Sequence, residues 1–217
     1  SMNHYLTEAE QGKLLATIGQ YREEKAQRDF HIVSALIASG LRIGEFLLVT
    51  VGDVYAALDT NYLYIPAANR KGGKRDHSVY LTKTLRRDLS SLLAIRESTD
   101  AEHYLVAGRN DQTPMSARNL QQRVKAWAKE AGLAHLDITP HYFRHTAAMN
   151  LLRHSSAREP LRVVKSALGH RNINSTSIYT EASREEVAEA MNAADQGRQP
   201  RITLAQLRRE YQRRTAA

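Results

Sequence analysis

Residues 139–145 read TPHYFRH and stand at the start of a helix that we expect over residues 142–154. His141 and Arg144 are three residues apart in this stretch, so their side chains share one helical face. A second helix is expected over residues 161–168, directly before a glycine, the residue that most often ends helices. The stretch and its continuation therefore predict a mainly helical fold.

The chain before residue 139 carries further helix signals. Thr7 can cap a helix in which Glu10 completes a capping box. Residues 29–39 are strongly apolar at helical spacing and stop at Gly40, a natural helix end. The remaining expected helices are 41–49, 83–96, 119–131 and 183–194, the last with a capping box of Ser183 and Glu186.

The pattern changes between residues 51 and 81. Residues 59–61 are a turn signal, and residues 62–65 and 77–81 favour strands because they are rich in aromatic and β-branched side chains. A glycine turn over residues 70–74 separates these two runs. The region predicts an antiparallel sheet of two or three strands, with four cations at its hairpin tip: Arg70, Lys71, Lys74 and Arg75. The fold class is thus mainly α with a small antiparallel β-sheet (α+β).

The composition narrows the classes of function. The 217 residues suffice for one large domain or two small ones. With no cysteine in the chain, disulfides, zinc–thiolate sites and cysteine nucleophiles are excluded, and a reducing cytoplasmic setting is expected. The chain has no run of about 18 apolar residues, so we expect no membrane span. Its first residues lack the basic and apolar regions of a signal peptide.

The charge is strongly basic. Lys and Arg number 31 against 23 acids, a net charge of +8, and the isoelectric point is near 9.8. Such a balance favours a polyanionic partner, with nucleic acid the first candidate.

Cleavage of DNA without a metal needs a nucleophile, cations around the phosphate and an acid for the leaving oxygen. Arginine suits the phosphate because its planar fork makes bidentate hydrogen bonds and stays charged. Tyrosine suits a cut that must be resealed, since the phosphotyrosine ester keeps the energy of the broken bond.

Four clusters in the chain meet these needs. Residues 40–45 read GLRIGE, which places Arg42 and Glu45 on one helical face, where Glu45 can orient a neighbouring basic group. The cationic hairpin tip and the TPHYFRH stretch are the second and third clusters. The fourth is LGH at residues 168–170, followed nine residues after its histidine by Tyr179.

With these motifs, the chain resembles the tyrosine recombinases, also called phage integrases. Their signature is an arginine in G-L-R-x-x-E, a lysine in a glycine-rich hairpin, H-x-x-R, L-G-H and then tyrosine. All of these occur here in order, and the resemblance extends from about Leu6 to about Asn192.

The resemblance implies a role for each matching residue. Arg42 and Arg144 would clamp the scissile phosphate, and Lys71 would be the general acid for the 5′ hydroxyl. His141 would assist proton transfer, and His170 would hydrogen-bond the phosphate or support the pocket. Tyr179 would attack the phosphate to form a 3′-phosphotyrosine.

The sequence departs from the family pattern at two places. Asn69 and Arg70 precede Lys71 where glycine is usual, which leaves Lys74 as an alternative acid. Residues 153–160 are about three residues longer than the usual turn between the two helices.

The family also implies a domain organisation. Residues 1–195 would be the catalytic domain, and residues 196–217 a basic tail whose helix, near 203–213, carries Leu204, Leu207 and Tyr211 on one face. That face would dock on a neighbouring subunit of a tetramer on two DNA sites, or on its own chain. Ser1 before Met2 is typical of tag removal, and we expect the family's N-terminal core-binding domain to be absent.

Further expectations concern partners. The partner is double-stranded DNA, and neither a cofactor, a metal nor a membrane is expected. Backbone phosphates would be contacted by a set of cations: Lys74, Arg75, Arg118, Arg123, Lys125 and Arg171. A zinc pair of His141 and His145 is the less favoured interpretation, since no carboxylate or cysteine lies near.

Two alternative functions stay open. A type IB topoisomerase uses a related pocket to relax DNA, and a DNA-binding protein without catalysis could keep the same fold.

Overall fold

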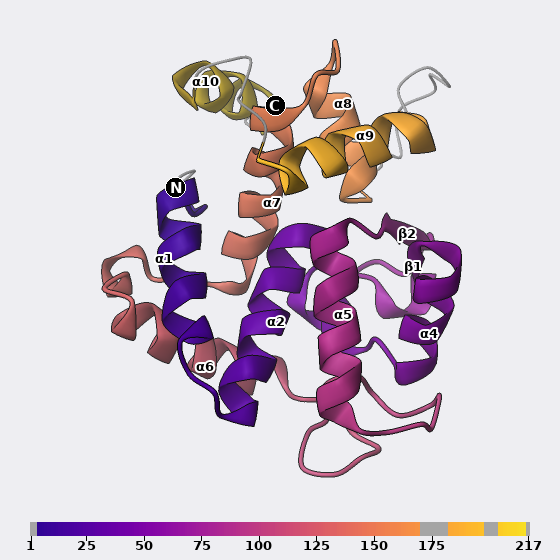
Figure 1. The fold of residues 1–217 in the computed structure, drawn as a ribbon. Coiled ribbons are helices and arrows are strands. Elements are labelled where there is room, and N and C mark those ends of the chain that lie inside the picture. Colours follow the sequence, from indigo (N-terminus) through magenta and orange to yellow (C-terminus); the bar gives the residue numbers. More distant parts are fainter. Residues whose placement is uncertain (1–3, 170–181, 198–203, 216–217) are drawn as a thin grey trace.

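The computed structural model describes residues 4–169, 182–197 and 204–215 (Figure 1). Its helices and strands, in chain order, are α1 (Glu8–Gly19), α2 (Glu24–Ser39), α3 (Ile43–Leu47), α4 (Val51–Thr60), β1 (Tyr62–Ile65), β2 (His77–Tyr80), α5 (Lys83–Arg96), α6 (Ala117–Glu130), α7 (Pro140–His154), α8 (Pro160–Ala167), α9 (Arg184–Asp195) and α10 (Leu204–Thr215). Two short 3₁₀ turns lie at Ala67–Asn69 and Ala134–Leu136.

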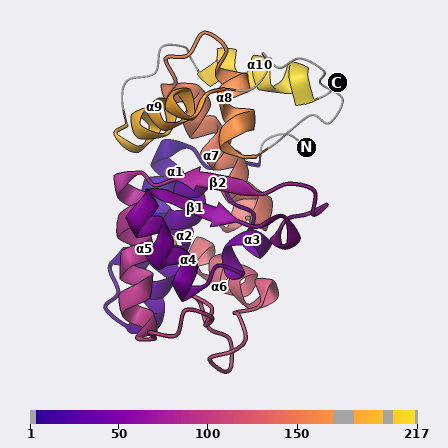
Figure 2. The same ribbon diagram turned by 90° about the vertical axis from the view of Figure 1, so that its right-hand side faces the viewer.

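The expected fold class is confirmed, because helices dominate and the described residues hold one two-stranded antiparallel sheet. Helices α1, α2, α5 and α6 and the β1–β2 hairpin form the larger body, from which α7 extends to α8, α9 and α10 (Figures 1 and 2). None of the helices in the described part of the chain has the length and apolar character needed to cross a membrane.

Helix α2 lies in the middle of the larger body. Its residues Ile32, Val33 and Leu36 are fully buried, and α1, α5 and α7 pack against it. Burying each such aliphatic side chain contributes roughly 1.5–3 kcal/mol. Gly40 ends this helix with φ 68°, and a Cβ there would overlap the side chain of Leu168. This close approach brings the end of α2 next to the end of α8.

The helix starts follow the capping signals in the sequence. The Thr7 hydroxyl accepts from the backbone N–H of Glu10, whose carboxylate accepts in turn from the N–H of Thr7. Ser183 and Glu186 form the same box at the start of α9. Both predicted capping boxes are therefore confirmed.

The hairpin pairs β1 with β2 in the register Tyr62 with Tyr80 and Ile65 with His77. Residues 51–60, which we expected to belong to the sheet region, instead form helix α4. Thr50 caps that helix, and Val51, Val54 and Ala57 bury one face of it at helical spacing. The assignment of this segment to the sheet region was therefore wrong, and only the two later runs are strands.

Helix α10 packs against α7 of the same chain. The ring of Tyr211 faces the edge of His145, with the centroids 6.4 Å apart. The guanidinium of Arg208 donates to the hydroxyl of Tyr5 and lies over its ring. The C-terminal helix is thus seated on its own domain in this structure.

Candidate active site

Arg144 lies in the second turn of α7 and joins three elements. Its Nη1 donates to the carbonyl oxygen of Gly40 at 2.6 Å, and its Nη2 to that of Leu168 at 2.8 Å. The residue is 5% exposed. Because both acceptors are helix-end carbonyls, the side chain is held rigidly where α2, α7 and α8 meet.

Arg42 stands at the start of α3, three residues before Glu45. Its Nη1 lies 2.7 Å from Oε1 of Glu45, a carboxylate that is 3% exposed. The arginine side chain itself is 30% exposed. Glu45 therefore orients Arg42 as the sequence spacing indicated, while part of the guanidinium stays open to a ligand.

Arg70 is a third cation at the site, and its place here was not predicted from the sequence. Its Nε lies 3.6 Å from Oε2 of Glu45, and its Nη2 donates to the carbonyl of Gly169 at 3.1 Å. The side chain is 10% exposed. We expected it at the hairpin tip together with Lys71, Lys74 and Arg75.

The three guanidinium groups act on one another. Burial is the main reason why the pKa of Arg144 falls to about 10, and the positive charges of Arg42 and Arg70 lower it further, against the opposing effect of Glu45. Arg144 is still charged at neutral pH. Three cations therefore share one buried carboxylate, which leaves an excess of positive charge that a bound anion would balance.

His77, the first residue of β2, also faces this group and was not predicted. Burial lowers its pKa to about 4, and the neighbouring charges of Arg70 and Arg144 lower it further. Its Nε2 is buried and has no hydrogen-bond partner among the described residues. The imidazole is neutral at physiological pH and adds no charge to the site.

The two candidate acids lie on the hairpin turn. Lys71 and Lys74 are both exposed, on either side of Gly72 and Gly73, whose φ angles are 86° and 55°. Arg75 beside them is exposed as well. All three lie on the turn that follows Arg70, which links it to the arginine group.

His141 is exposed in the first turn of α7, one turn before Arg144. His170, Arg171 and Tyr179 lie outside the described residues. Gly169, the residue before His170, is described: it has φ 73°, and a Cβ there would come within 2.5 Å of Arg70 Nη2 and 3.0 Å of His77. The L-G-H motif therefore starts against the arginine group.

The predicted DNA contacts on α6 differ in their surroundings. Arg118 is exposed, and Lys125 is exposed with Asp137 3.9 Å away. Arg123 instead donates to the buried carboxylate of Asp29 at 2.6 Å, so part of its charge is neutralised within the protein.

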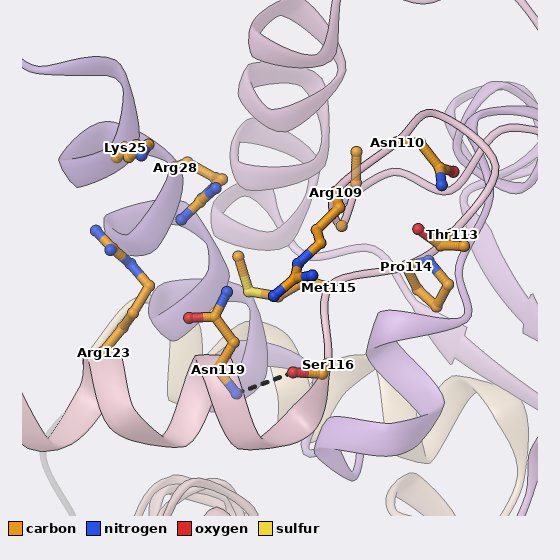
Figure 3. A pocket seen from close by; sticks show the side chains of 12 residues that line it. Lys25, Arg28, Arg109, Asn110, Thr113, Pro114, Met115, Ser116, Asn119 and Arg123 are labelled. Carbon is orange, nitrogen blue, oxygen red and sulfur yellow. Dashed lines mark hydrogen bonds between the residues drawn. The ribbon is translucent and has the colours of Figure 1, made fainter.

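A basic cavity of about 730 Å³ lies between the start of α2, the loop 107–116 and the start of α6. Figure 3 shows Arg28, Arg109, Asn119 and Arg123 approaching the same space from these three segments. We call it the α6 pocket. Asp29, which pairs with Arg28 and Arg123, is buried, and Arg109 is exposed.

His141 and His145, four residues apart in the sequence, both lie on α7. His145 packs edge-on against Tyr211, and no group of three or more metal-ligating side chains occurs in the part of the chain that the structure describes.

Comparison with known proteins identifies the family. The model of the phage integrase family matches residues 4–186. The chain belongs to the phage integrase family.

Curated members of the phage integrase family are similar to this chain over most of its length. Tyrosine recombinase XerC of Neisseria gonorrhoeae is 31% identical over 169 residues, which cover 78% of this chain and 52% of XerC. Tyrosine recombinase XerA of Pyrococcus horikoshii is 27% identical over 194 residues, which cover 89% of this chain and 62% of XerA. The chain thus spans between about half and two thirds of the length of these relatives.

Solved structures in the family share the fold. The crystal structure of XerA recombinase matches with a TM-score of 0.63 and 28% identity, covering 93% of this chain and 68% of that one. The XerH site-specific recombinase, in a post-cleavage complex with palindromic difH substrate, matches with a TM-score of 0.64 over 88% of this chain and 53% of that one. At 23% identity, the XerH likeness concerns the fold alone.

Proposed function

We propose that this chain is the catalytic part of a site-specific DNA recombinase, which cleaves and rejoins strands through a 3′-phosphotyrosine intermediate. The observation that carries the proposal is the group of Arg42, Arg70 and Arg144 around the one buried carboxylate of Glu45. A scissile phosphodiester would balance this excess of positive charge. Negative charge accumulates on its equatorial oxygens in the transition state, where fixed arginines stabilise it most.

Tyr179 is the proposed nucleophile. Its phenol oxygen attacks the phosphorus, so a bond to the tyrosine forms and the bond to the 5′ oxygen breaks. His141 takes the proton of the phenol, and Lys71 gives a proton to the departing 5′ oxygen. Attack of a 5′ hydroxyl on the phosphotyrosine reverses these transfers and reseals the strand.

Arg42 and Arg144 clamp the non-bridging oxygens of the phosphate in this scheme, and His170 donates a further hydrogen bond. The fixed position of Arg144 supports the clamp, because two of its nitrogens already donate to backbone carbonyls. Such preorganisation lowers the barrier, since the donors need no rearrangement during the reaction.

Duplex DNA is the proposed partner. The XerH neighbour was solved bound to difH substrate, and the Tn1549 integrase in complex with circular intermediate DNA. In this chain, backbone phosphates would contact Lys74 and Arg75 at the hairpin tip, Arg118, Arg123 and Lys125 on α6, and Arg171. We place the protein with the DNA of its cell, in the cytoplasm.

Assembly into a tetramer on two DNA sites, through a Holliday junction, also belongs to this proposal. Helix α10 would be the docking element. It packs against α7 of its own chain in this structure. The same surface of α7 could bind α10 of a neighbouring copy instead.

The test is capture of a covalent adduct. A pool of nicked DNA duplexes, randomised on both sides of the nick, is incubated with the chain, and the protein–DNA adducts are isolated under denaturing conditions and sequenced. We expect adducts on a defined sequence for the wild type and none for Tyr179→Phe, although both bind duplex DNA equally. An adduct on Tyr179→Phe would remove Tyr179 as nucleophile.

Two further outcomes separate the alternatives. Firm DNA binding by the wild type without any adduct would point to a binding protein without catalysis. Relaxation of a supercoiled plasmid that lacks the selected sequence would instead point to a type IB topoisomerase.

A further inference from the structure

Arg70 contacts three segments, and each of them adjoins a residue of the proposed catalytic set. Its Nη2 donates to Gly169, the neighbour of His170. Its Nε faces Glu45, the carboxylate that holds Arg42. The remaining contact is within the hairpin, where Nη1 donates to the carbonyl of Arg75 at 3.1 Å.

The backbone of Arg70 is fixed as well. Its N–H donates to the carbonyl of Ala67, and its own carbonyl accepts from the N–H of Gly73, at 3.0 and 2.9 Å. Lys71 is the next residue along the chain. Arg70 is therefore the last firmly held residue before the exposed turn that carries Lys71.

The turn beyond Arg70 is closed by the backbone hydrogen bond from the N–H of Gly73 to the carbonyl of Arg70. Gly72 and Gly73 have positive φ angles, and nothing within 4 Å would meet a Cβ on Gly72. Glycine allows many backbone conformations, so a turn with two glycines restrains the lysine beside them only weakly. A general acid must nevertheless come within hydrogen-bond distance of the leaving oxygen.

The side chain of Arg70 makes its contacts within the protein. Two of its guanidinium nitrogens donate to the carbonyls of Arg75 and Gly169, and its Nε lies 3.6 Å from Oε2 of Glu45 without a hydrogen bond. The fit is also close, since Gly169 has no room for a Cβ beside Nη2. The contacts join the hairpin to the rest of the site.

We propose that Arg70 is a positioning residue for the leaving-group proton: it anchors the hairpin to α3 and to the L-G-H turn and so holds Lys71 at the 5′ oxygen. The inference rests on the proposed recombinase function and deepens it. The usual glycine of the family at this position could make none of these side-chain contacts.

The experiment compares two matched suicide duplexes of the sequence selected by adduct capture. One has oxygen at the 5′ bridging position of the scissile phosphate, and the other has sulfur. Sulfur leaves as a thiolate, whose conjugate acid has a pKa of roughly 8.5, so its departure needs no general acid. A defect in the acid or its position therefore disappears on the sulfur duplex.

We expect Arg70→Ala to slow cleavage of the oxygen duplex by about 100-fold, the effect of a displacement near 1 Å, and to cleave the sulfur duplex at close to the wild-type rate. Arg70→Lys should behave in the same way, because one ammonium cannot reach both carbonyls and Glu45. Lys71→Ala is the reference for a lost acid, with a defect on the oxygen duplex alone. Arg42→Ala is the reference for a lost clamp, with a defect on both duplexes.

Arg75→Ala is the matched control, since it removes a positive charge from the same hairpin and keeps the carbonyl that Arg70 uses. Its effect on DNA affinity should be equal for the two duplexes. Circular dichroism of each variant shows whether it folds, and Arg70→Lys retains the charge beside Glu45 if Arg70→Ala does not fold.

Equal defects of both Arg70 variants on the two duplexes, or no defect at all, would overturn the positioning role. A wild-type chain that cleaves neither duplex would instead refute the proposed recombinase function, so the two failures are distinguishable.

Discussion

Oε1 of Glu45 lies 2.7 Å from Nη1 of Arg42, three residues earlier in the chain. This carboxylate is only 3% exposed. Carboxylates are seldom buried unless they are paired. Its other oxygen faces Arg70. The balance of charge in the site therefore depends on one buried acid.

Glu45→Gln keeps the shape of the side chain and removes its charge. We expect the free energy of unfolding to fall by about 3–5 kcal/mol, the usual cost of leaving a buried charge without its partner. Cleavage should slow as well, since Arg42 loses its orienting group. Urea unfolding measures the first effect, with Glu102→Gln, an exposed acid, as control; an equal change in both variants would contradict this role of Glu45.

Arg144→Ala removes donors from two helix-end carbonyls as well as a proposed phosphate clamp. The transition state should lose about 3 kcal/mol of stabilisation, as when one charge-stabilising donor is lost. Stability should fall too, because each unpaired buried carbonyl costs about 1–3 kcal/mol. Single-turnover cleavage by the folded fraction separates the two effects. A change in DNA affinity alone, with an unaltered cleavage rate, would argue against the clamp.

Lys71 and Lys74 are both exposed on the same turn, so chemistry must decide between them. We expect Lys71→Ala to slow cleavage of an oxygen-bridged duplex by roughly 10²–10⁴-fold, the usual contribution of a general acid, and sulfur at the bridging position to restore the rate. Lys74→Ala should affect both duplexes alike through DNA affinity. If sulfur rescues Lys74→Ala instead, Lys74 is the acid.

The sequence predicted those parts of the fold and site that depend on short spacings. Capping boxes at Thr7 and Ser183 and the bounds of α5 follow from neighbouring residues, as does the pairing of Arg42 with Glu45. Helix α4 was not predicted, although Thr50 and Asp53 form a capping box at its start. Residues 51–60 were instead assigned to the sheet region because strand signals follow directly after residue 60.

The sequence did not predict the inward position of the Arg70 side chain, for a different reason. Its hydrogen bond to Gly169 spans 99 residues of chain, and no local pattern records a contact over that distance. His77 was missed for the same reason, since its environment is formed by Arg70 and Arg144 rather than by its own strand.

Asp29 should be important for stability although it lies outside the arginine group. The carboxylate is 1% exposed and accepts from Arg123 at 2.6 Å and from Trp127 Nε1 at 2.9 Å, which fastens α6 to α2. Asp29→Ala should lower the free energy of unfolding by about 1–3 kcal/mol, because the partly buried donors of Arg123 and Trp127 lose their acceptor. Urea unfolding provides the measurement.

The control for Asp29 is Asp137→Asn. Asp137 is exposed and 3.9 Å from the exposed Lys125, and surface pairs of this kind contribute about 0–1 kcal/mol. Asn also tolerates the positive φ of that position. A loss at Asp29→Ala no larger than that at Asp137→Asn would show that the buried pair does not hold α6 in place.

His77 predicts a pH dependence of stability. Its pKa in the folded protein is about 4, below the ordinary value of 6.5, first because of burial and then because of the charges of Arg70 and Arg144. Between these pH values the unfolded chain binds a proton that the folded protein does not, so stability is complete above about pH 6.5 and falls as the pH drops toward 4. At about 1.4 kcal/mol per pH unit the loss is on the order of 3 kcal/mol.

The variant His77→Asn isolates this contribution from other groups that titrate in the same range. An asparagine cannot bind the proton, so the variant should lack this part of the acid destabilisation. The difference in unfolding free energy between wild type and variant, measured in urea at several pH values from 4 to 7, should therefore shift in favour of the variant as the pH falls. Parallel pH profiles would mean that the imidazole is not kept neutral by the site.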